Sequence, residues 1–251
     1  MILITNDDGF LAKGITEAAA IARQFDDVVI VAPDQPRSGQ SNALTVNMPI
    51  VYTKVRTDNN LTLYTCTGTP VDCVKLAFSG EIDGLPRPSL LISGINHGSN
   101  ASINVLYSGT IGAAIEGSLY GVPSIGLSLC NHDLNADFAP VRAPFAAIVR
   151  DVIEHGLPQG IALNVNAPKG DIRGVRVCRQ ARGKWSQEFM ASPTPRGYYC
   201  YWLTGDFSNV ETEATDTDQY ALDCGYISVQ PIHTDMTHYP TMETLQYLKR
   251  N

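Results

Sequence analysis

Two adjacent acidic residues near the start of the chain, Asp7 and Asp8, are the side chains whose spacing most clearly suggests chemistry. They follow the apolar run at residues 2–5, which is typical of a short buried strand, and Gly9 after them permits a sharp turn. Neighbouring carboxylates repel one another unless a cation neutralises them or one is protonated. The pair is therefore a candidate metal site. The alternative is that one carboxylate caps the following helix while the other faces water.

Two neutral side chains could complete such a site. Ser38 lies in the polar segment 33–39 and Asn96 in the polar segment 93–100, and each segment comes directly after a predicted strand, as the aspartate pair does. In a parallel sheet the carboxyl ends of the strands share one edge, so segments distant in sequence converge there. Carboxylate, hydroxyl and amide oxygens suit a hard divalent ion, Mg²⁺ or Mn²⁺, rather than zinc. Such an ion activates bound water for hydrolysis.

Another polar cluster, Tyr107-Ser108-Gly109-Thr110, precedes a predicted helix that carries no acidic residue at its start. Free backbone N–H groups, two hydroxyls and the positive end of the helix would form a site for a phosphate-sized anion. The segment Thr67-Gly68-Thr69-Pro70 repeats this pattern before a second helix. In both places an ordinary helix cap is the alternative. A divalent ion beside a phosphate-binding loop indicates hydrolysis of phosphate esters.

Several other reaction classes lack their sequence signatures. The chain contains no G-x-S-x-G nucleophile elbow, no G-x-x-x-x-G-K-[ST] loop and no G-x-G-x-x-G fingerprint. The five histidines show no metal-ligand spacing. His97 could serve as a proton donor or substrate contact, or could lie on a surface loop, and the other four are expected to be structural or exposed.

The elements that must position these side chains alternate between strands and helices over the first 170 residues, which predicts an α/β fold with a mostly parallel sheet and helices on both faces. Beyond residue 170 the composition changes, and residues 179–205 are rich in Gly, Pro, Tyr and Trp, which is typical of a β-hairpin or irregular extension. We expect one domain over residues 1–251, with a core at 1–170 and a C-terminal extension at 171–251. The predicted strands cover residues 2–5, 28–32, 50–55, 61–67, 90–92, 125–129, 162–165 and 226–230, and the predicted helices cover 14–25, a segment from Pro70, 108–120, 138–155 and 239–249.

Composition excludes further classes. The 251 residues carry 18 basic and 25 acidic side chains, a net charge of −7, which disfavours binding to duplex nucleic acid. No apolar stretch is long enough to span a membrane, and the N-terminus does not resemble a signal peptide. The six cysteines form no C-x-x-C pair and are expected to be reduced. We therefore expect a soluble cytoplasmic protein with no membrane partner.

Taken in order, these motifs make the chain resemble the SurE family of stationary-phase survival proteins, which are metal-dependent nucleotidases. The resemblance extends over nearly the whole chain, and its departures fall in loops, at residues 12–14, 40–42, 102 and 104, rather than at the predicted metal ligands. The matching segments are Asn6-Asp7-Asp8-Gly9, Ala32-Pro33-Asp34, Arg37-Ser38-Gly39, Thr67-Gly68-Thr69-Pro70, Ser93-Gly94-Ile95-Asn96 with Gly98 and Asn100, Tyr107-Ser108-Gly109-Thr110, Asn164-Val165-Asn166-Ala167-Pro168, Thr215-Asp216 and Gly225-Tyr226-Ile227-Ser228.

The resemblance implies that the α/β core is Rossmann-like. It also implies one divalent ion per subunit, held by four residues of the polar clusters, and a C-terminal arm exchanged between the subunits of a homodimer or homotetramer. It also implies that the substrates are nucleoside 5′- and 3′-monophosphates and that short polyphosphate is a possible further substrate. The implied metal ligands are Asp7, Asp8, Ser38 and Asn96.

Our hypothesis is that the ion binds a phosphate oxygen and polarises a water for in-line attack on phosphorus, with Asp7, Asp8 and Asn96 as catalytic residues. Either aspartate could take the proton of the water. Phosphate binding is assigned to Asn100, Ser108, Gly109 and Thr110. Two alternatives stay open: a phosphatase that passes through an aspartyl-phosphate, although such enzymes use D-x-D rather than adjacent acids, and a module that senses nucleotides or polyphosphate without hydrolysis.

Overall fold

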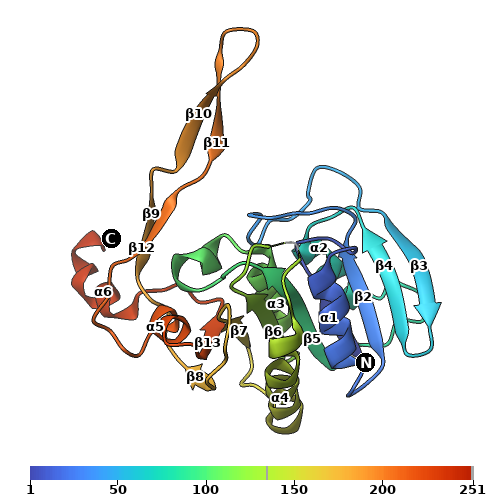
Figure 1. The fold of residues 1–251 in the computed structure, drawn as a ribbon. Helices are drawn as coiled ribbons and strands as arrows, with labels where there is room; N and C mark the ends of the chain where they lie inside the picture. Colours follow the sequence, from blue (N-terminus) through green and yellow to red (C-terminus); the bar gives the residue numbers. More distant parts are fainter. Residues whose placement is uncertain (134, 250–251) are drawn as a thin grey trace.

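In the computed structural model, which describes residues 1–133 and 135–249, nine strands form one twisted sheet in the order β3-β4-β2-β1-β5-β6-β7-β13-β8 (Figure 1). The central strands β1, β2 and β6 are buried along their whole length, which explains their uninterrupted apolar sequences. The strands are β1 (Ile2–Thr5), β2 (Val28–Pro33), β3 (Tyr52–Asp58), β4 (Leu61–Cys66), β5 (Leu90–His97), β6 (Ser124–Leu129), β7 (Ile161–Ala167), β8 (Val175–Val177) and β13 (Ile227–His233).

The sheet is mostly parallel, as the sequence predicts. Strands β4, β2, β1, β5, β6 and β7 all run the same way. Near one edge β3 pairs with β4 as an antiparallel hairpin, and toward the other edge β13 runs antiparallel to β7. The α/β fold with a Rossmann-like parallel core is therefore confirmed.

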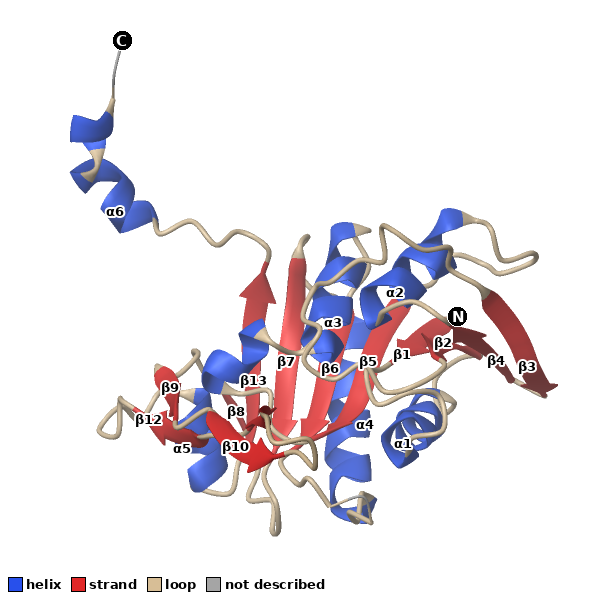
Figure 2. Ribbon diagram, turned by 90° about the horizontal axis from the view of Figure 1, so that it is seen from above, coloured by secondary structure: helices blue, strands red, loops and turns tan. Residues whose placement is uncertain are grey.

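Helices cover both faces of the sheet (Figure 2). Helices α1 (Lys13–Ala22) and α4 (Ala139–His155) pack on one face, and α2 (Pro70–Ser79) and α3 (Gly109–Leu119) pack on the other. Strand β1 shows the alternation that produces two cores: Ile2 and Ile4 pack with the α1/α4 side, and Leu3 packs with the α2/α3 side.

Helix α2 begins where its sequence predicts. The Thr69 hydroxyl accepts a hydrogen bond from the Asp72 N–H at 3.1 Å, and the Asp72 carboxylate accepts one from the Thr69 N–H at 2.9 Å. This reciprocal pair satisfies two backbone donors that a helix start would otherwise leave free. The predicted cap at Thr69 is confirmed.

The C-terminal part contains the predicted hairpin. Strands β9 (Gly183–Ser186) and β12 (Asp206–Asn209) pair antiparallel, as do β10 (Phe189–Pro193) and β11 (Tyr199–Leu203). Together they form an arm that projects from the body of the molecule in Figure 1. We call β9 and β12, with the turn residues next to them, the arm root.

Most predicted elements begin and end within three residues of their bounds in the structure, and three of the differences have a physical reason. Strand β5 continues to His97 instead of ending at Ile92, because residues 96–97 resume pairing with β6 after an irregularity. Strand β13 continues past Pro231 to His233. Proline has no backbone N–H to donate, but β8 pairs with β13 only as far as Val229, so position 231 has no partner strand on that side.

The third difference is at the C-terminal end. The predicted helix 239–249 is divided into α6 (Tyr239–Thr244) and a short 3₁₀ turn (Gln246–Leu248) after α5 (Asp218–Asp223) and β13. None of the helices described in residues 1–133 and 135–249 is both long and apolar enough to cross a membrane.

Candidate active site

The strand order reverses at the middle of the sheet, between β1 and β5. From β1 the chain proceeds to β2 and β4 on one side, and from β5 it proceeds to β6 and β7 on the other. Loops that leave neighbouring strands in opposite directions open a crevice at this point, where ligands of such folds bind. Asp7 and Asp8 lie directly after β1, and Asn96 lies near the end of β5.

A cavity of about 760 Å³ opens at this edge of the sheet. This volume is in the range of sites for small organic ligands, and it is far larger than a phosphate group needs. Its lining comes from the loops after β1, β2 and β5, from the start of α3, from the loop after β6 and from the arm root. The lining residues are Asp7, Asp8, Ser38, Gly39, Asn96, His97, Gly98, Ser99, Asn100, Asn104, Tyr107, Ser108, His132, Trp185, Glu188, Leu203, Thr204 and Gly205.

The carboxylate of Asp7 lies at the N-terminal end of α3. Its Oδ1 accepts a hydrogen bond from the Thr110 hydroxyl at 2.5 Å, and a Cβ added to Gly109 would lie 2.9 Å from the Asp7 Cβ. Asp7 is only 4% exposed. Burial raises its pKa to about 6; hydrogen bonds from Thr110 oppose the rise, and the neighbouring Asp8 adds to it.

Asp8 is held from the opposite side of the crevice. Its Oδ2 accepts the backbone N–H of His97 at 3.2 Å, which ties the loop after β1 to the end of β5. Burial also raises the pKa of Asp8, while the His97 N–H and the nearby rings of His97 and His132 lower it. Both acidic side chains are thus partly removed from water, and their pKa values are raised. A bound cation would lower these pKa values and favour the ionised carboxylates.

Ser38 and Asn96 reach the same cavity from separate loops. The loop of Ser38 is attached to the aspartates, since the Arg37 N–H donates to the Asp7 carbonyl at 2.7 Å. Gly9, at a φ of 91°, lets the chain turn where a Cβ would lie 3.2 Å from the Gln35 backbone. The Asn96 amide nitrogen donates to the Gly98 carbonyl at 2.9 Å, which leaves the Asn96 carbonyl oxygen for a ligand.

The donor set fits a hard divalent cation. The four predicted ligands all carry side-chain oxygens and line one cavity, and no lysine or arginine is among the described lining residues to neutralise Asp7 and Asp8. Among residues 1–133 and 135–249, no group of three or more His, Cys, Asp or Glu side chains is placed so that these residue types alone could hold a metal ion. Two carboxylates with neutral oxygens, leaving room for waters, correspond to Mg²⁺ or Mn²⁺ chemistry.

Comparison with known proteins shows the family to which the chain belongs. A family profile described as "Survival protein SurE" matches residues 2–187. The chain belongs to the SurE family. It is 50% identical to the 5′-nucleotidase SurE of Phocaeicola vulgatus over 98% of this chain and 95% of the relative, and 47% identical to that of Flavobacterium johnsoniae over 100% and 97%. The structure is similar to the crystal structure of the SurE protein from Aquifex aeolicus, with a TM-score of 0.84, 33% identity and 99% coverage of both chains.

In this SurE chain the residues predicted to bind phosphate divide into two groups. Asn100 and Ser108 line the cavity, whereas Gly109 and Thr110 are not among its lining residues. Thr110 is fully buried, and its hydroxyl donates to Asp7. The helix start that carries no acidic residue of its own therefore faces a carboxylate from the loop after β1, and the Thr110 hydroxyl, which was predicted to contact phosphate, contacts Asp7 in the structure.

Sequence reasoning missed several lining residues of this SurE site. His132, expected to be structural or exposed, lies beside Gly98 and lines the cavity, because the loop after β6 ends at the same sheet edge. Trp185 and Leu203 to Gly205 reach the cavity from the arm root. The aromatic content of residues 179–205 was visible in the sequence, but its position over the crevice was not.

Proposed function

We propose that this chain is a metal-dependent phosphohydrolase that removes phosphate from nucleoside 5′-monophosphates. The observation that carries the proposal is that Asp7, Asp8, Ser38 and Asn96 line one cavity at the reversal of strand order, with both carboxylates resisting ionisation in the absence of a cation. The relatives named 5′-nucleotidase SurE, aligned over nearly the whole chain, support the same activity.

Asp7, Asp8, Ser38 and Asn96 would hold one Mg²⁺ or Mn²⁺ ion. When bound, such an ion supplies electrostatic stabilisation of the phosphoryl oxygens and lowers the pKa of water. One oxygen of each carboxylate accepts a protein hydrogen bond, from Thr110 for Asp7 and from His97 for Asp8. We assign the second oxygen of each side chain to the metal or to the proton that leaves the attacking water.

The phosphoryl group would lie between the aspartates and the start of α3. Ser108, the N-cap of α3, lines the cavity, and the positive end of the helix favours an anion there. Asn100 borders the other side, with its amide group directed to Ser128 at 2.8 Å. These groups bind and orient the ester, and charge stabilisation of this kind is usually the largest contribution to catalysis.

We extend the proposal to 3′-monophosphates and short polyphosphate as further substrates, because the cavity of about 760 Å³ is far larger than one phosphate group. We further propose a homodimer or homotetramer in the cytoplasm, assembled through the C-terminal arm. Strands β10 and β11 carry large apolar side chains that are mostly exposed, including Phe189, Tyr201 and Trp202 at 66%, 66% and 60% exposure. Exposed apolar clusters of this kind mark protein interfaces.

Phosphate release from AMP, 3′-AMP and tripolyphosphate, measured with EDTA and with added Mg²⁺ or Mn²⁺, tests the proposal. We expect release from AMP that EDTA abolishes and the metal restores. Saturable AMP binding without phosphate release under any metal would contradict the proposal and favour a sensing module. A phosphorylated Asp7 trapped during turnover would contradict direct attack by water.

A further inference from the structure

The wall of the cavity opposite the sheet is built by the arm root. Trp185 of β9 lines the cavity together with Leu203 at the end of β11 and with Thr204 and Gly205 between β11 and β12. The floor of the cavity is polar and comes from the loops that follow the parallel strands. The arm root thus supplies an aromatic surface to a cavity whose floor is suited to a phosphate group.

The indole ring of Trp185 is fixed in place by two contacts. Its Nε1–H donates to the side-chain oxygen of Asn104 at 2.9 Å, and its ring meets Phe207 edge-to-face with the centroids 5.8 Å apart. Asn104 itself lines the cavity, on the 3₁₀ turn Ser102–Leu106. Trp185 is half-buried, so its contacts hold the ring without covering it completely.

The arm root is attached to the site loop by a buried carboxylate. Asp218 is fully buried; its Oδ2 accepts the Ser102 N–H at 2.8 Å, and its Oδ1 accepts the Ala181 N–H at 2.8 Å. Ser102 begins the 3₁₀ turn that carries Asn104, and Ala181 precedes β9. One side chain therefore sets the distance between the loop and the strand that together hold Trp185.

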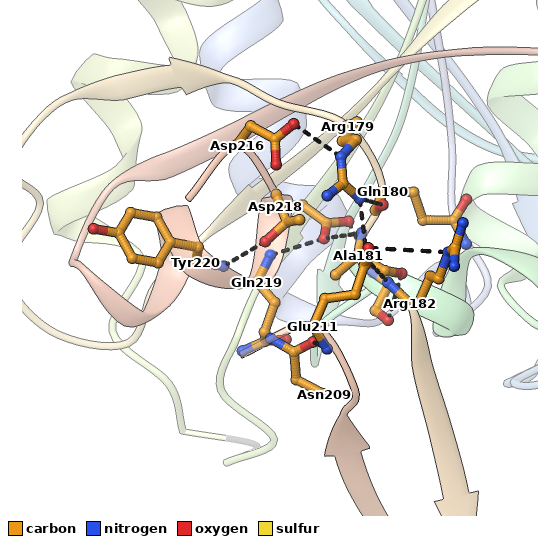
Figure 3. Close-up of polar contacts among 12 residues, drawn as sticks. Arg179, Gln180, Ala181, Arg182, Asn209, Glu211, Asp216, Asp218, Gln219 and Tyr220 are labelled. Carbon is orange, nitrogen blue, oxygen red and sulfur yellow. Dashed lines mark hydrogen bonds and ion pairs between the residues drawn. The ribbon is translucent and has the colours of Figure 1, made fainter. Parts of the chain in front are cut away.

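An exposed ion-pair network supports the same junction. Figure 3 shows Arg179 between Asp216 and the segment that leads into β9. Its Nε lies 2.9 Å from the Asp216 carboxylate, and its Nη1 lies 3.0 Å from the Glu211 carboxylate. Each exposed pair contributes little to stability by itself, but together they connect the segment that leads into β9 with the segment that follows β12.

We infer that Trp185 determines substrate specificity by stacking against the base of a nucleotide whose phosphate lies at the aspartates. This inference rests on the proposed function and specifies the substrate class of the same cavity as compounds with a flat aromatic group. A phosphate group fills only a small part of about 760 Å³, so the remaining space is left for the nucleoside. Every base has a π-face, so stacking on one indole tolerates all bases.

Fluorescence tests the contact without catalysis. The chain has 2 tryptophans, so the Trp202→Phe variant leaves Trp185 as the only tryptophan. We expect saturable quenching of its emission by adenosine and by AMP, and none by ribose 5-phosphate. The matched control is Trp185→Phe, which leaves only Trp202 of β11, a residue that is not among the described lining residues of the cavity, and should show no saturable quenching. Equal quenching of both variants, or none in Trp202→Phe, would overturn the inference.

Kinetics of the metal-loaded enzyme provide the second test. Base stacking predicts that Trp185→Leu lowers the ratio of kcat/KM for AMP to that for ribose 5-phosphate by about 5- to 150-fold, mainly through KM. Trp185→Phe, which keeps an aromatic ring, should restore most of the ratio, and Trp202→Leu should leave it as in the wild type. An unchanged ratio in Trp185→Leu would refute the role of the ring.

The two proposals fail separately. If the protein releases phosphate from no nucleotide but adenosine still quenches Trp185, the proposed function is wrong and the stacking role of Trp185 is retained. If AMP is hydrolysed in a metal-dependent way but Trp185→Leu has the same ratio of kcat/KM for AMP to that for ribose 5-phosphate as the wild type, the stacking role of Trp185 is wrong and the proposed function is retained.

Discussion

The hydroxyl of Thr110 donates a hydrogen bond to Oδ1 of Asp7, which joins the start of α3 to the end of β1. This contact fixes one carboxylate oxygen and thereby directs the other. Partners that orient a metal ligand typically affect metal affinity or activity by about 10- to 100-fold. Thr110 is therefore a positioning residue for the proposed metal site.

We predict that Thr110→Val, which keeps the shape of the side chain but removes the hydroxyl, lowers phosphate release from AMP by about 10- to 100-fold. Thr110→Ser, which keeps the hydroxyl, should remain close to the wild type. Thermal unfolding of both variants checks that the fold is intact. Equal activities of the Val and Ser variants would show that the hydroxyl does not orient Asp7.

The metal-free protein should respond to pH through Asp7. Because burial raises the pKa of Asp7 to about 6 from 3.8, the folded state binds more protons than the unfolded state between these values. Protonation of Asp7 therefore stabilises the folded state, by about 3 kcal/mol. This contribution to the free energy of unfolding is complete below pH 3.8 and is lost as the pH rises through 6. Asp7→Asn, which cannot ionise, escapes this loss.

We therefore predict that metal-free Asp7→Asn unfolds like the wild type near pH 4 but is more stable by up to about 3 kcal/mol at pH 7. Denaturant unfolding in EDTA at both pH values measures the difference. The same variant should lose phosphate release by orders of magnitude, since it lacks a ligand charge. A wild type that is equally stable or more stable than the variant at pH 7 would contradict this account of Asp7.

Metal binding should stabilise the folded protein. A ligand at 100 times its Kd adds about 2.7 kcal/mol, which raises the Tm of a chain of this size by about 5–11 °C. We predict such a shift with Mn²⁺ in the wild type and a much smaller shift in Asp8→Asn. Asp34→Asn is the matched control, because Asp34 is exposed, pairs with Arg37 and does not line the cavity. A full shift in Asp8→Asn would place the ion elsewhere.

A buried asparagine network holds the loop of Asn100. Asn166 Oδ1 accepts the Asn100 N–H at 2.8 Å, and Asn164 Nδ2 donates to the Asn100 carbonyl at 2.9 Å. Asn166→Ala would leave the buried Asn100 N–H without an acceptor, which costs about 1–3 kcal/mol. We predict this loss in denaturant unfolding, together with reduced activity, because Asn100 borders the phosphate site.

The matched control for the network is Asn60→Ala. Asn60 also accepts a hydrogen bond through its side-chain oxygen, from Arg23 at 2.7 Å, but it does so at the surface in the turn between β3 and β4. Surface substitutions of this kind change stability by about 0.5 kcal/mol or less. Similar losses in the two variants would contradict a special role for the buried network.

Much of the fold follows from local sequence signals. The uninterrupted apolar runs of β1, β2 and β6 predict buried parallel strands, and Thr69-Pro70 predicts the start of α2, because these signals act within a few residues. The adjacency of Asp7 and Asp8, and the position of Ser38 and Asn96 after strands, likewise place them at one sheet edge. Their common cavity is the tertiary consequence.

Contacts between distant segments could not be predicted in this way. The pattern around Thr110 predicts a helix cap open to an anion, but only the fold shows that the nearest anion is Asp7, 103 positions away. His132 and Trp185 carry no local motif, and their place in the cavity depends on where the loop after β6 and the arm root lie. The break after Thr244 in the predicted helix 239–249 similarly lies in a segment that packs no buried residue to hold it together.

Two separate parts of the chain line the cavity, and this has an evolutionary consequence. The loops after the parallel strands carry the groups proposed for chemistry, while the arm root carries the aromatic wall. Mutations in the arm can therefore retune which leaving groups are accepted while the hydrolytic apparatus stays intact. Lineages that diverge in the arm would be expected to diversify in substrate range first.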